Sequence, residues 1–348
     1  MRCEIVTIIS TNYGNRLQNY ATQELLTQMG FKVTTRIVRR HPILTKMKWL
    51  YQSFRLKTMS DYFAKFNIKI DWKYVKKYSP IEDFNVDFFV AGSDQVWNPA
   101  FSNTMDQWKY YLLDFVHDGK RISYAASIGV DRLDKTYQTD FKAALLKYSA
   151  VSMREESGRR IVKELTGRDA EVLIDPTMML DKSDWLKIAH KPKKIDTDRP
   201  YILTYFLGGR SERVNRTLNQ FAQEYKCQVY NLMDLSQPEV YVSGPSEFIY
   251  LFSRAKLILT DSFHACVFSF LFEKPFLVYA REGEYNNMMS RLDTFLKKFH
   301  LERKYVDSGL PNDILESDYQ KGYEVLSKER QKTMEYLKSA MNIQQQKE

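Results

Sequence analysis

Short apolar runs rich in β-branched residues alternate with longer amphipathic stretches, a pattern typical of a parallel sheet flanked by helices. In the first half of the chain the pattern predicts strands at 3–9, 32–38, 86–92, 121–127, 149–153 and 170–174. Between the first two strands it predicts a helix from about Arg16 to Met29, which Gly30 ends. These elements predict an N-terminal α/β domain.

The same alternation starts again after a polar stretch that contains prolines. Here it predicts strands at 201–207, 227–232, 256–260 and 275–280, with helices near 211–225, 246–254 and 263–272. A chain of 348 residues also exceeds the roughly 250 residues at which a single core usually stops growing. We therefore expect an N-terminal Rossmann-like domain at 1–175, a linker at 176–199, a C-terminal Rossmann-like domain at 200–315, a helix at 316–341 and a frayed tail at 342–348.

Composition changes this picture in one segment only. Apolar residues make up 44% of the chain and charged residues 27%, which excludes wholesale disorder, collagen and coiled coil. The formal net charge of +9 is concentrated at 31–80, where thirteen Lys and Arg face two acidic residues. Aromatic residues are interleaved with these cations: Trp49, Tyr51, Phe54, Tyr62, Phe63, Phe66, Trp72 and Tyr74.

Two interpretations of the segment 31–80 remain open. Interleaved aromatic and basic residues suit an anionic membrane surface or a pyrophosphate-linked lipid substrate. Alternatively, the segment is an insertion packed on the N-terminal domain with a solvated basic face. Nucleic acid is not expected as a partner, because no RRM, KH or helix-turn-helix pattern accompanies the basic residues.

The cysteines and the apolar stretches bear on the compartment. Cys3, Cys227 and Cys266 are odd in number and far apart, which argues against a disulfide framework or a zinc site. The N-terminal apolar run is too short for a signal peptide, and the most apolar stretch, 265–272, is too short to span a bilayer. We expect a cytoplasmic protein, with peripheral attachment to the inner face of the cytoplasmic membrane left open.

The stretch TDSFHACVFSFLFEKPFLVY, 260–279, carries the strongest chemical signal. It leads from a predicted strand into a helix that Asp261 or Ser262 can cap, which places His264 beside first-turn N–H groups where anions bind. Histidine titrates near neutrality and can act as a general acid or base. A histidine bonded to backbone within a capping turn is the alternative. No second His or Cys stands at ligand spacing, so no metal is expected.

Two arginines are further candidates. Arg154, in VSMREESG, lies between a predicted strand and a helix that we expect Ser157 to cap. Its guanidinium can offer a bidentate fork to a phosphate or carboxylate, and the alternative is a surface ion pair with Glu155 or Glu156. Arg291 lies near the start of another helix, where a salt bridge along the helix face is the more ordinary role.

Two loops that follow predicted strands are rich in hydrogen-bonding groups. GSDQVWNP, 92–99, has an aromatic platform in Trp97, and TNYGNRLQ, 11–18, joins a strand to a helix through a glycine. The candidates for an acceptor or cleft site in these loops are Asn12, Gly14, Asn15, Gln18, Ser93, Asp94, Gln95 and Trp97. Loops that merely satisfy buried backbone groups are the alternative. Dinucleotide, P-loop, G-x-S-x-G and H-E-x-x-H motifs do not occur.

Taken in order, these motifs resemble the polysaccharide pyruvyl transferase family. The resemblance covers about residues 4–300. It rests on NYGNRLQNYATQELL, GSDQVWNP, RISYAASIG, VSMREESG, EVLIDPTMMLD, TDSFHACVFSFLFEKPFLVY and SRLDTFL. It implies an α/β fold of two Rossmann-like domains facing a cleft, similar to the glycosyltransferase B type.

The resemblance also implies a reaction and a set of roles. A pyruvyl group moves from phosphoenolpyruvate to a sugar of a cell-surface glycan or its lipid-linked precursor, usually as a ketal across two hydroxyls, and no cofactor is implied. His264 is then the general acid or base. The donor-binding candidates are Arg154, Asp261, Ser262, Phe263 and Arg291. Some family members carry a donor-binding arginine where this chain has Ser262.

Other functions are compatible with the same two-domain pattern. A glycosyltransferase that uses a nucleotide sugar would place a diphosphate at the same helix terminus. An inactive glycan-binding relative is a non-enzymatic alternative, which Ser262 favours and the presence of His264 and Arg154 disfavours. The acceptor sugar, its hydroxyl pair and the oligomeric state are not predicted.

Overall fold

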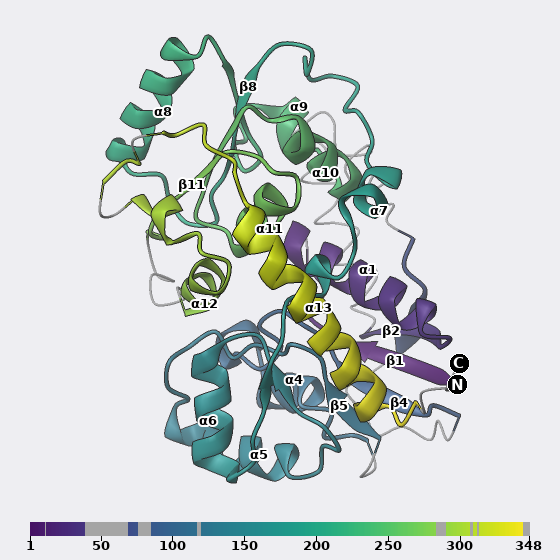
Figure 1. The fold of residues 1–348 in the computed structure, drawn as a ribbon. Helices are drawn as coiled ribbons and strands as arrows, with labels where there is room; N and C mark the ends of the chain where they lie inside the picture. The colour runs from purple at the N-terminus through teal and green to yellow at the C-terminus, as the bar shows by residue number, and fades with distance from the viewer. Residues whose placement is uncertain are drawn as a thin grey trace. The chain divides into compact units, whose positions relative to one another are not determined.

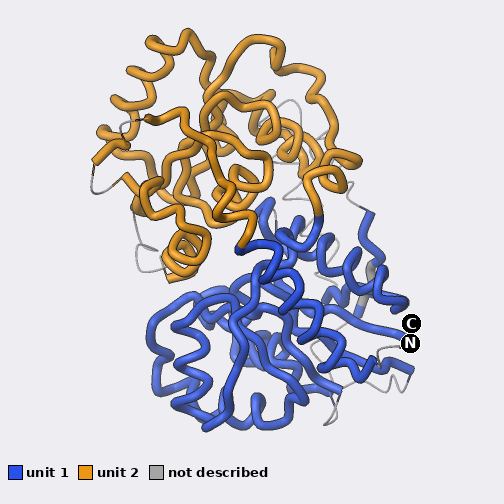
Figure 2. The backbone as a smooth tube through the Cα atoms, in the orientation of Figure 1, with its two compact units in different colours: residues 1–40, 69–180, 325–348 blue, residues 41–68, 181–324 orange. Residues whose placement is uncertain are grey.

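The computed structural model describes residues 1–10, 12–38, 69–75, 85–116, 120–282, 290–306, 309–311 and 313–343. The chain forms two compact units, shown in Figure 2. Unit 1 comprises 1–40, 69–180 and 325–348, and the described part of unit 2 falls within 181–324. Most of the basic segment 31–80 lies outside the described residues, so both interpretations of its surface role stay predictions.

Unit 1 is built on a parallel sheet with the strand order β3-β2-β1-β4-β5, and Figure 1 labels β1, β2, β4 and β5 of this sheet. The strands are β1 (Arg2–Val6), β2 (Lys32–Val38), β3 (Trp72–Val75), β4 (Phe88–Ala91) and β5 (Arg121–Ser123). A short parallel pair, β6 (Ser152–Met153) and β7 (Glu171–Val172), adjoins β5 through isolated bridges. All the strands predicted for this half are confirmed. The strand β3 was not predicted, because it lies in the basic segment 31–80.

Helices cover both faces of this sheet. They are α1 (Tyr13–Gln28), α4 (Met105–Tyr111), α5 (Lys135–Leu145), α6 (Glu156–Thr166) and the C-terminal α13 (Gln320–Ala340), with 3-10 turns η1 (Pro99–Phe101) and η2 (Pro176–Met178). Successive strand residues enter different cores: Ile5 packs with Leu337 of α13, whereas Val6 packs with residues of α4 and α5. This alternation is the two-residue period of a strand buried on both faces.

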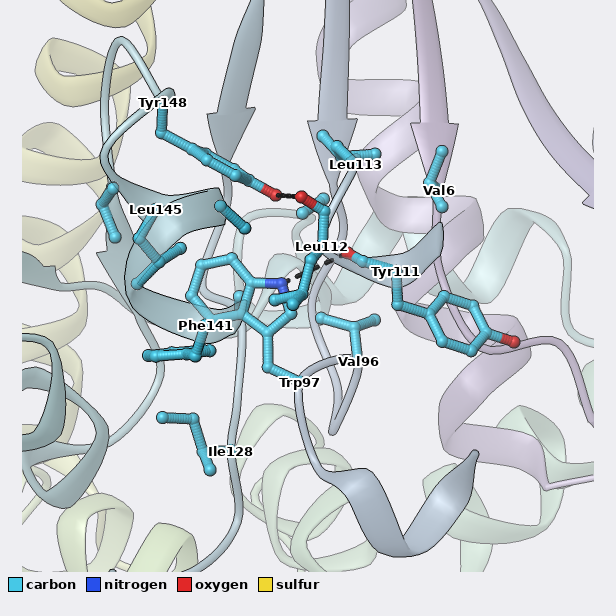
Figure 3. Close-up of a cluster of buried hydrophobic side chains, with 14 of the residues drawn as sticks. Val6, Val96, Trp97, Tyr111, Leu112, Leu113, Ile128, Phe141, Leu145 and Tyr148 are labelled. Carbon is cyan, nitrogen blue, oxygen red and sulfur yellow. Dashed lines mark hydrogen bonds between the residues drawn. The ribbon is translucent and has the colours of Figure 1, made fainter. Parts of the chain in front are cut away.

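The second of these cores surrounds Trp97 (Figure 3). Its indole is fully buried, meets Phe141 and Tyr148 edge-on at ring-centroid distances of 5.6 and 5.8 Å, and donates to the Tyr111 carbonyl oxygen at 3.3 Å. The Tyr148 hydroxyl donates to the neighbouring carbonyl of Leu112 at 3.0 Å. Trp97 is therefore a core side chain here, and the platform predicted for a ligand is not on the surface of unit 1.

Trp97→Ala is expected to lower the free energy of unfolding by about 3–5 kcal/mol, because it leaves a large cavity and an unpaired carbonyl. Chemical denaturation followed by circular dichroism measures the loss. Leu146→Ala, at a side chain that is 53% exposed in the same unit, is the control and should change stability by less than about 0.5 kcal/mol. Equal stabilities for the two variants would contradict the burial of the indole.

Unit 2 contains a second parallel sheet, ordered β11-β10-β8-β9. Its strands are β8 (Tyr201–Tyr205), β9 (Gln228–Asn231), β10 (Leu257–Thr260) and β11 (Phe276–Val278). The helices are α7 (Lys182–Lys187), α8 (Glu212–Glu224), α9 (Pro238–Tyr241), α10 (Pro245–Arg254), α11 (Phe263–Leu271) and α12 (Ser290–Lys298), with a 3-10 turn η3 (Glu302–Lys304). Every strand predicted for this half is confirmed. All nine residues of α11 are buried, as its apolar sequence on every face requires.

The compact units change over between Leu180 and Asp181, inside the predicted linker 176–199, which itself carries η2 and α7. The predicted C-terminal helix is α13, and from Val325 onward it belongs to unit 1. There Arg330 donates to the carbonyl oxygens of Met178 and Leu180 at 2.7 and 3.0 Å. In the part of the chain that the structure describes, no helix is both long and apolar enough to cross a bilayer.

Candidate functional site

The topology of each unit marks one edge of its sheet for ligand binding. In an open parallel sheet, ligands bind beyond the carboxyl ends of the strands, where the strand order reverses. In unit 1 the order reverses between β1 and β4, and in unit 2 it reverses between β8 and β10. The loops that follow these four strands contain most of the candidates from the sequence.

In unit 1, the loops after β1 and β4 are joined by buried polar side chains. Asn15, in the first turn of α1, donates to the Asp94 carboxylate and accepts from the Ser10 hydroxyl. Gln18 donates to the Thr7 hydroxyl at 2.9 Å. Both predicted loops therefore contribute to one polar cluster, as their positions at neighbouring strand ends require.

Asp94 has an unusual backbone conformation in this cluster. Its φ of 72° lies in the left-handed region, which non-glycine residues seldom adopt except where the surroundings enforce it. Its Oδ1 accepts from the Gln95 backbone N–H at 2.9 Å and from Arg154 at 3.2 Å, and its side chain is 10% exposed. The turn thus holds a carboxylate at the switch point of unit 1, that is, beyond the ends of β1 and β4, between which the strand order reverses.

Arg154 is buried between two carboxylates. Its Nη1 lies 2.7 Å from Asp175 Oδ2 and its Nη2 lies 3.2 Å from Asp94 Oδ1, while the Ser93 hydroxyl donates to Asp175 at 2.8 Å. Burial by itself lowers the pKa of the Arg154 guanidinium, but the Asp175 and Asp94 carboxylates outweigh it and raise that pKa. The residue links the turns after β4, β6 and β7, and its predicted contact with the donor stays a prediction.

The surroundings of Arg154 differ from the expected ones in two respects. The helix that follows has Glu155 as its N-cap residue, whereas Ser157 lies inside the helix. Glu155 does not pair with Arg154 as a surface acid would: its buried Oε1 accepts from the backbone N–H groups of Ile128 and Gly129 at 2.9 and 3.0 Å. The predicted cap at Ser157 is therefore wrong, and the alternative of a surface ion pair is excluded because Arg154 is buried between Asp94 and Asp175.

The remaining candidates of unit 1 have local bonding partners. Asn12 is the N-cap of α1, and its side chain accepts from the Gly14 N–H at 2.8 Å. Gln95 accepts from the Asn98 amide at 2.7 Å, which stabilises the loop 92–99. These contacts give Asn12, Gly14 and Gln95 structural roles, and their predicted contact with a ligand stays a prediction.

In unit 2, Asp261 closes the turn after β10 in a way that the sequence did not predict. Ser262 is the N-cap residue of α11 and makes no side-chain capping bond, and the Asp261 carboxylate points to the loop after β8. There Asp261 accepts from the Leu207 and Gly208 N–H groups at 2.7 and 2.8 Å. The expected N-cap position of Ser262 is confirmed, but neither side chain makes a capping bond, and the Asp261 carboxylate accepts from amides of another loop instead.

His264 lies in the first turn of α11, directly beyond this turn. The residue is 6% exposed, and its ring meets the Phe263 ring edge-on with centroids 5.2 Å apart. The first N–H groups of an α-helix have no acceptor within the helix, so the imidazole lies beside donors and the positive end of the helix dipole. The predicted position of His264 at the start of a helix is confirmed, and its role as a general acid or base stays a prediction.

The other predicted donor residues are Phe263, the first residue of α11, and Arg291, in α12. The Phe263 ring packs on Phe295 of α12 at a centroid distance of 5.7 Å. Arg291 is a buried residue of α12. The start of α11 is thus linked to the second half of α12 by an aromatic contact, and the role of Arg291 toward a donor stays a prediction.

Two residues that were not predicted from the sequence belong to these clusters. Asp175 follows β7 and pairs with Arg154, and Arg281 follows β11 and lies 3.4 Å from Asp261, measured from Nε to Oδ2. Both stand just after a predicted strand, in EVLIDP and PFLVYAR. The rule that selected the other candidates, a polar residue at the carboxyl end of a strand, would have found both.

Comparison with known proteins agrees with this architecture. A family model described as polysaccharide pyruvyl transferase matches residues 12–283. No curated protein matches the chain. Among solved structures, S. aureus MnaA with UDP is similar, with a TM-score of 0.50 at 11% identity over 100% of this chain and 99% of that one. A UDP-N-acetylglucosamine 2-epimerase gives the same TM-score of 0.50, identity of 11% and coverage of 100% and 99%. The predicted fold class, α/β with two Rossmann-like units of the glycosyltransferase B type, is confirmed.

Proposed function

We propose that this chain, which belongs to the polysaccharide pyruvyl transferase family, transfers a pyruvyl group from phosphoenolpyruvate to a sugar. The product is a ketal across two hydroxyls of a cell-surface glycan or its lipid-linked precursor. The observation that carries the proposal is the position of His264 in the first turn of α11, beyond the strand end at which the order of the unit 2 sheet reverses.

The chemistry of the donor explains why a histidine is needed. Phosphoenolpyruvate is an enol phosphate, and a proton added to its methylene carbon leaves an oxocarbenium-like centre at the neighbouring carbon. In our proposal His264 delivers that proton. The oxygen of the first sugar hydroxyl then bonds to this centre, and the hydroxyl proton returns to the imidazole. Such a positioned acid and base contributes about 10²- to 10⁴-fold to a rate.

The second half of the reaction closes the ketal. The carbon–oxygen bond to phosphate breaks, and the bonding electrons leave with the phosphate. The second hydroxyl bonds to the same carbon, and its proton leaves with the phosphate. The N–H groups at the start of α11 would stabilise the anionic donor during these steps, because the helix dipole and N–H groups that have no acceptor within the helix favour negative charge.

We propose that the acceptor binds at the switch point of unit 1. Asp94 is held there by Arg154 and Asn15, and its carboxylate retains some exposure. A fixed carboxylate accepts hydrogen bonds from hydroxyl groups, which are the groups that a sugar presents. Attachment of that sugar to a polyprenyl pyrophosphate, and contact of the segment 31–80 with anionic lipid at the inner face of the cytoplasmic membrane, remain parts of the proposal.

Ligand-induced thermal stabilisation distinguishes the proposal from its alternatives. A ligand that binds the native state raises the melting temperature, so phosphoenolpyruvate in excess should do so and UDP- or GDP-sugars should not. Stabilisation by a nucleotide sugar but not by phosphoenolpyruvate would instead identify a nucleotide-sugar glycosyltransferase. Stabilisation by glycans alone would indicate a glycan-binding relative without activity.

A further inference from the structure

A cationic side chain, that of Arg281, lies close to the amino end of α11. Arg281 follows β11, and its Nη2 donates to the backbone carbonyl oxygen of Asp261, the residue before the N-cap, at 3.1 Å. Its side chain is only 10% exposed. We propose that Arg281 binds the anionic donor beside His264, and that Asp261 is the positioning residue that holds it there. This inference rests on the proposed function.

The guanidinium of Arg281 is only loosely paired with Asp261. Its Nε lies 3.4 Å from Asp261 Oδ2 and, among the described residues, makes no hydrogen bond. A strong arginine–carboxylate pair has two parallel N–H···O bonds, and this pair has none of that geometry. Since guanidinium has five N–H donors in a planar fork, this pairing leaves it the capacity to bind a phosphate or carboxylate.

The Asp261 carboxylate in turn is already engaged by the loop after β8. Both of its oxygens accept backbone N–H groups, from Leu207 at 2.7 Å and from Gly208 at 2.8 Å. Its negative charge is therefore shared between two amides and the guanidinium. Because the pair is largely buried, the field of the guanidinium on a bound anion is less screened than it would be in water.

Gly208 shows how closely the loops after β8 and β11 approach each other. A Cβ at Gly208 would lie 2.5 Å from the Glu282 carbonyl oxygen and 3.0 Å from Arg281 Cγ. Any larger residue there must displace the backbone that carries Arg281. Gly209, the next residue, has no atom within 4 Å of the corresponding position, so the chain offers a matched pair of substitutions.

The first test is the phosphoenolpyruvate dependence of the rate in Arg281 variants of the full chain. Arg281→Gln should lower kcat/KM for phosphoenolpyruvate by about 10- to 100-fold, the effect of one lost charge-assisted contact, while KM for the acceptor stays unchanged. Arg281→Lys should recover part of the loss, since it restores the charge without the fork. Asp261→Asn should act in the same direction as Arg281→Gln.

The glycine pair supplies a test that leaves the charge intact. Gly208→Ala should raise KM for phosphoenolpyruvate, and Gly209→Ala should behave as the wild type, with circular dichroism showing that both are folded. A wild-type enzyme whose Arg281→Gln and Gly208→Ala variants keep the normal phosphoenolpyruvate dependence overturns this inference alone. A wild-type protein that neither binds nor consumes phosphoenolpyruvate overturns the proposed function, and the inference with it.

Discussion

His264→Ala is expected to lower kcat for pyruvyl transfer by about 10²- to 10⁴-fold, while the protein stays folded. The reason is that protonation of the donor's methylene carbon needs an acid at a fixed position, and α11 supplies one at its buried amino end. His264→Gln is the sharper variant, because glutamine keeps a hydrogen-bonding side chain of similar size but cannot transfer a proton at neutral pH.

The control for this prediction is His190→Ala. His190 is exposed in unit 2, so its loss should leave both turnover and the melting temperature unchanged. Product formation by His264→Ala and His264→Gln at rates within a few-fold of the wild type would remove His264 from the mechanism.

Arg154→Leu is expected to destabilise the protein by about 3–5 kcal/mol, the typical cost of removing one partner from a buried ion pair. In the wild type one guanidinium neutralises two carboxylates, and Asp175 is entirely buried. Without the guanidinium, the negative charges of Asp94 and Asp175 are left unbalanced with little water to stabilise them. Arg154→Lys should lose less stability, because the ammonium group keeps the positive charge. Some loss should remain, because an ammonium group cannot bridge both carboxylates as the planar guanidinium does.

Chemical denaturation of the variants measures this loss. Arg159→Leu is the matched control, since Arg159 forms an exposed pair with Glu156 in the same helix, and such pairs contribute at most about 1 kcal/mol. Adding Asp175→Asn to Arg154→Leu should restore part of the stability, because it removes one of the two unbalanced charges. If Arg154→Leu proves as stable as Arg159→Leu, Arg154 does not have the structural role described above.

The strands and the main helices could be predicted because their signal is local. Alternating apolar residues report burial on each face of a strand, and the run 263–272 is apolar on every side, as a fully buried helix requires. The rule that sites lie beyond the carboxyl ends of strands then led to Asp94, Arg154 and His264. Each of these steps uses residues that are neighbours in the sequence.

The partners of these residues could not be predicted, because the packing of strands that are far apart in sequence decides them. Arg154 meets Asp94 across 60 residues, whereas the nearby Glu155 is turned toward the amides of Ile128 and Gly129. Trp97 was misplaced for a related reason. The chain turns at Asp94, which has a positive φ, and the indole of Trp97, three residues further along the chain, enters the core.

Transfer of labelled pyruvyl carbon is the measurement that tests the central claim. The full chain is incubated with labelled phosphoenolpyruvate and a panel of lipid-linked or nitrophenyl sugars, and the products are followed by mass spectrometry together with released phosphate. We predict a labelled sugar ketal, phosphate released in equal amount, and both products formed about 10²- to 10⁴-fold more slowly with His264→Ala. Consumption of a nucleotide sugar with no label transferred from phosphoenolpyruvate would contradict the proposed function.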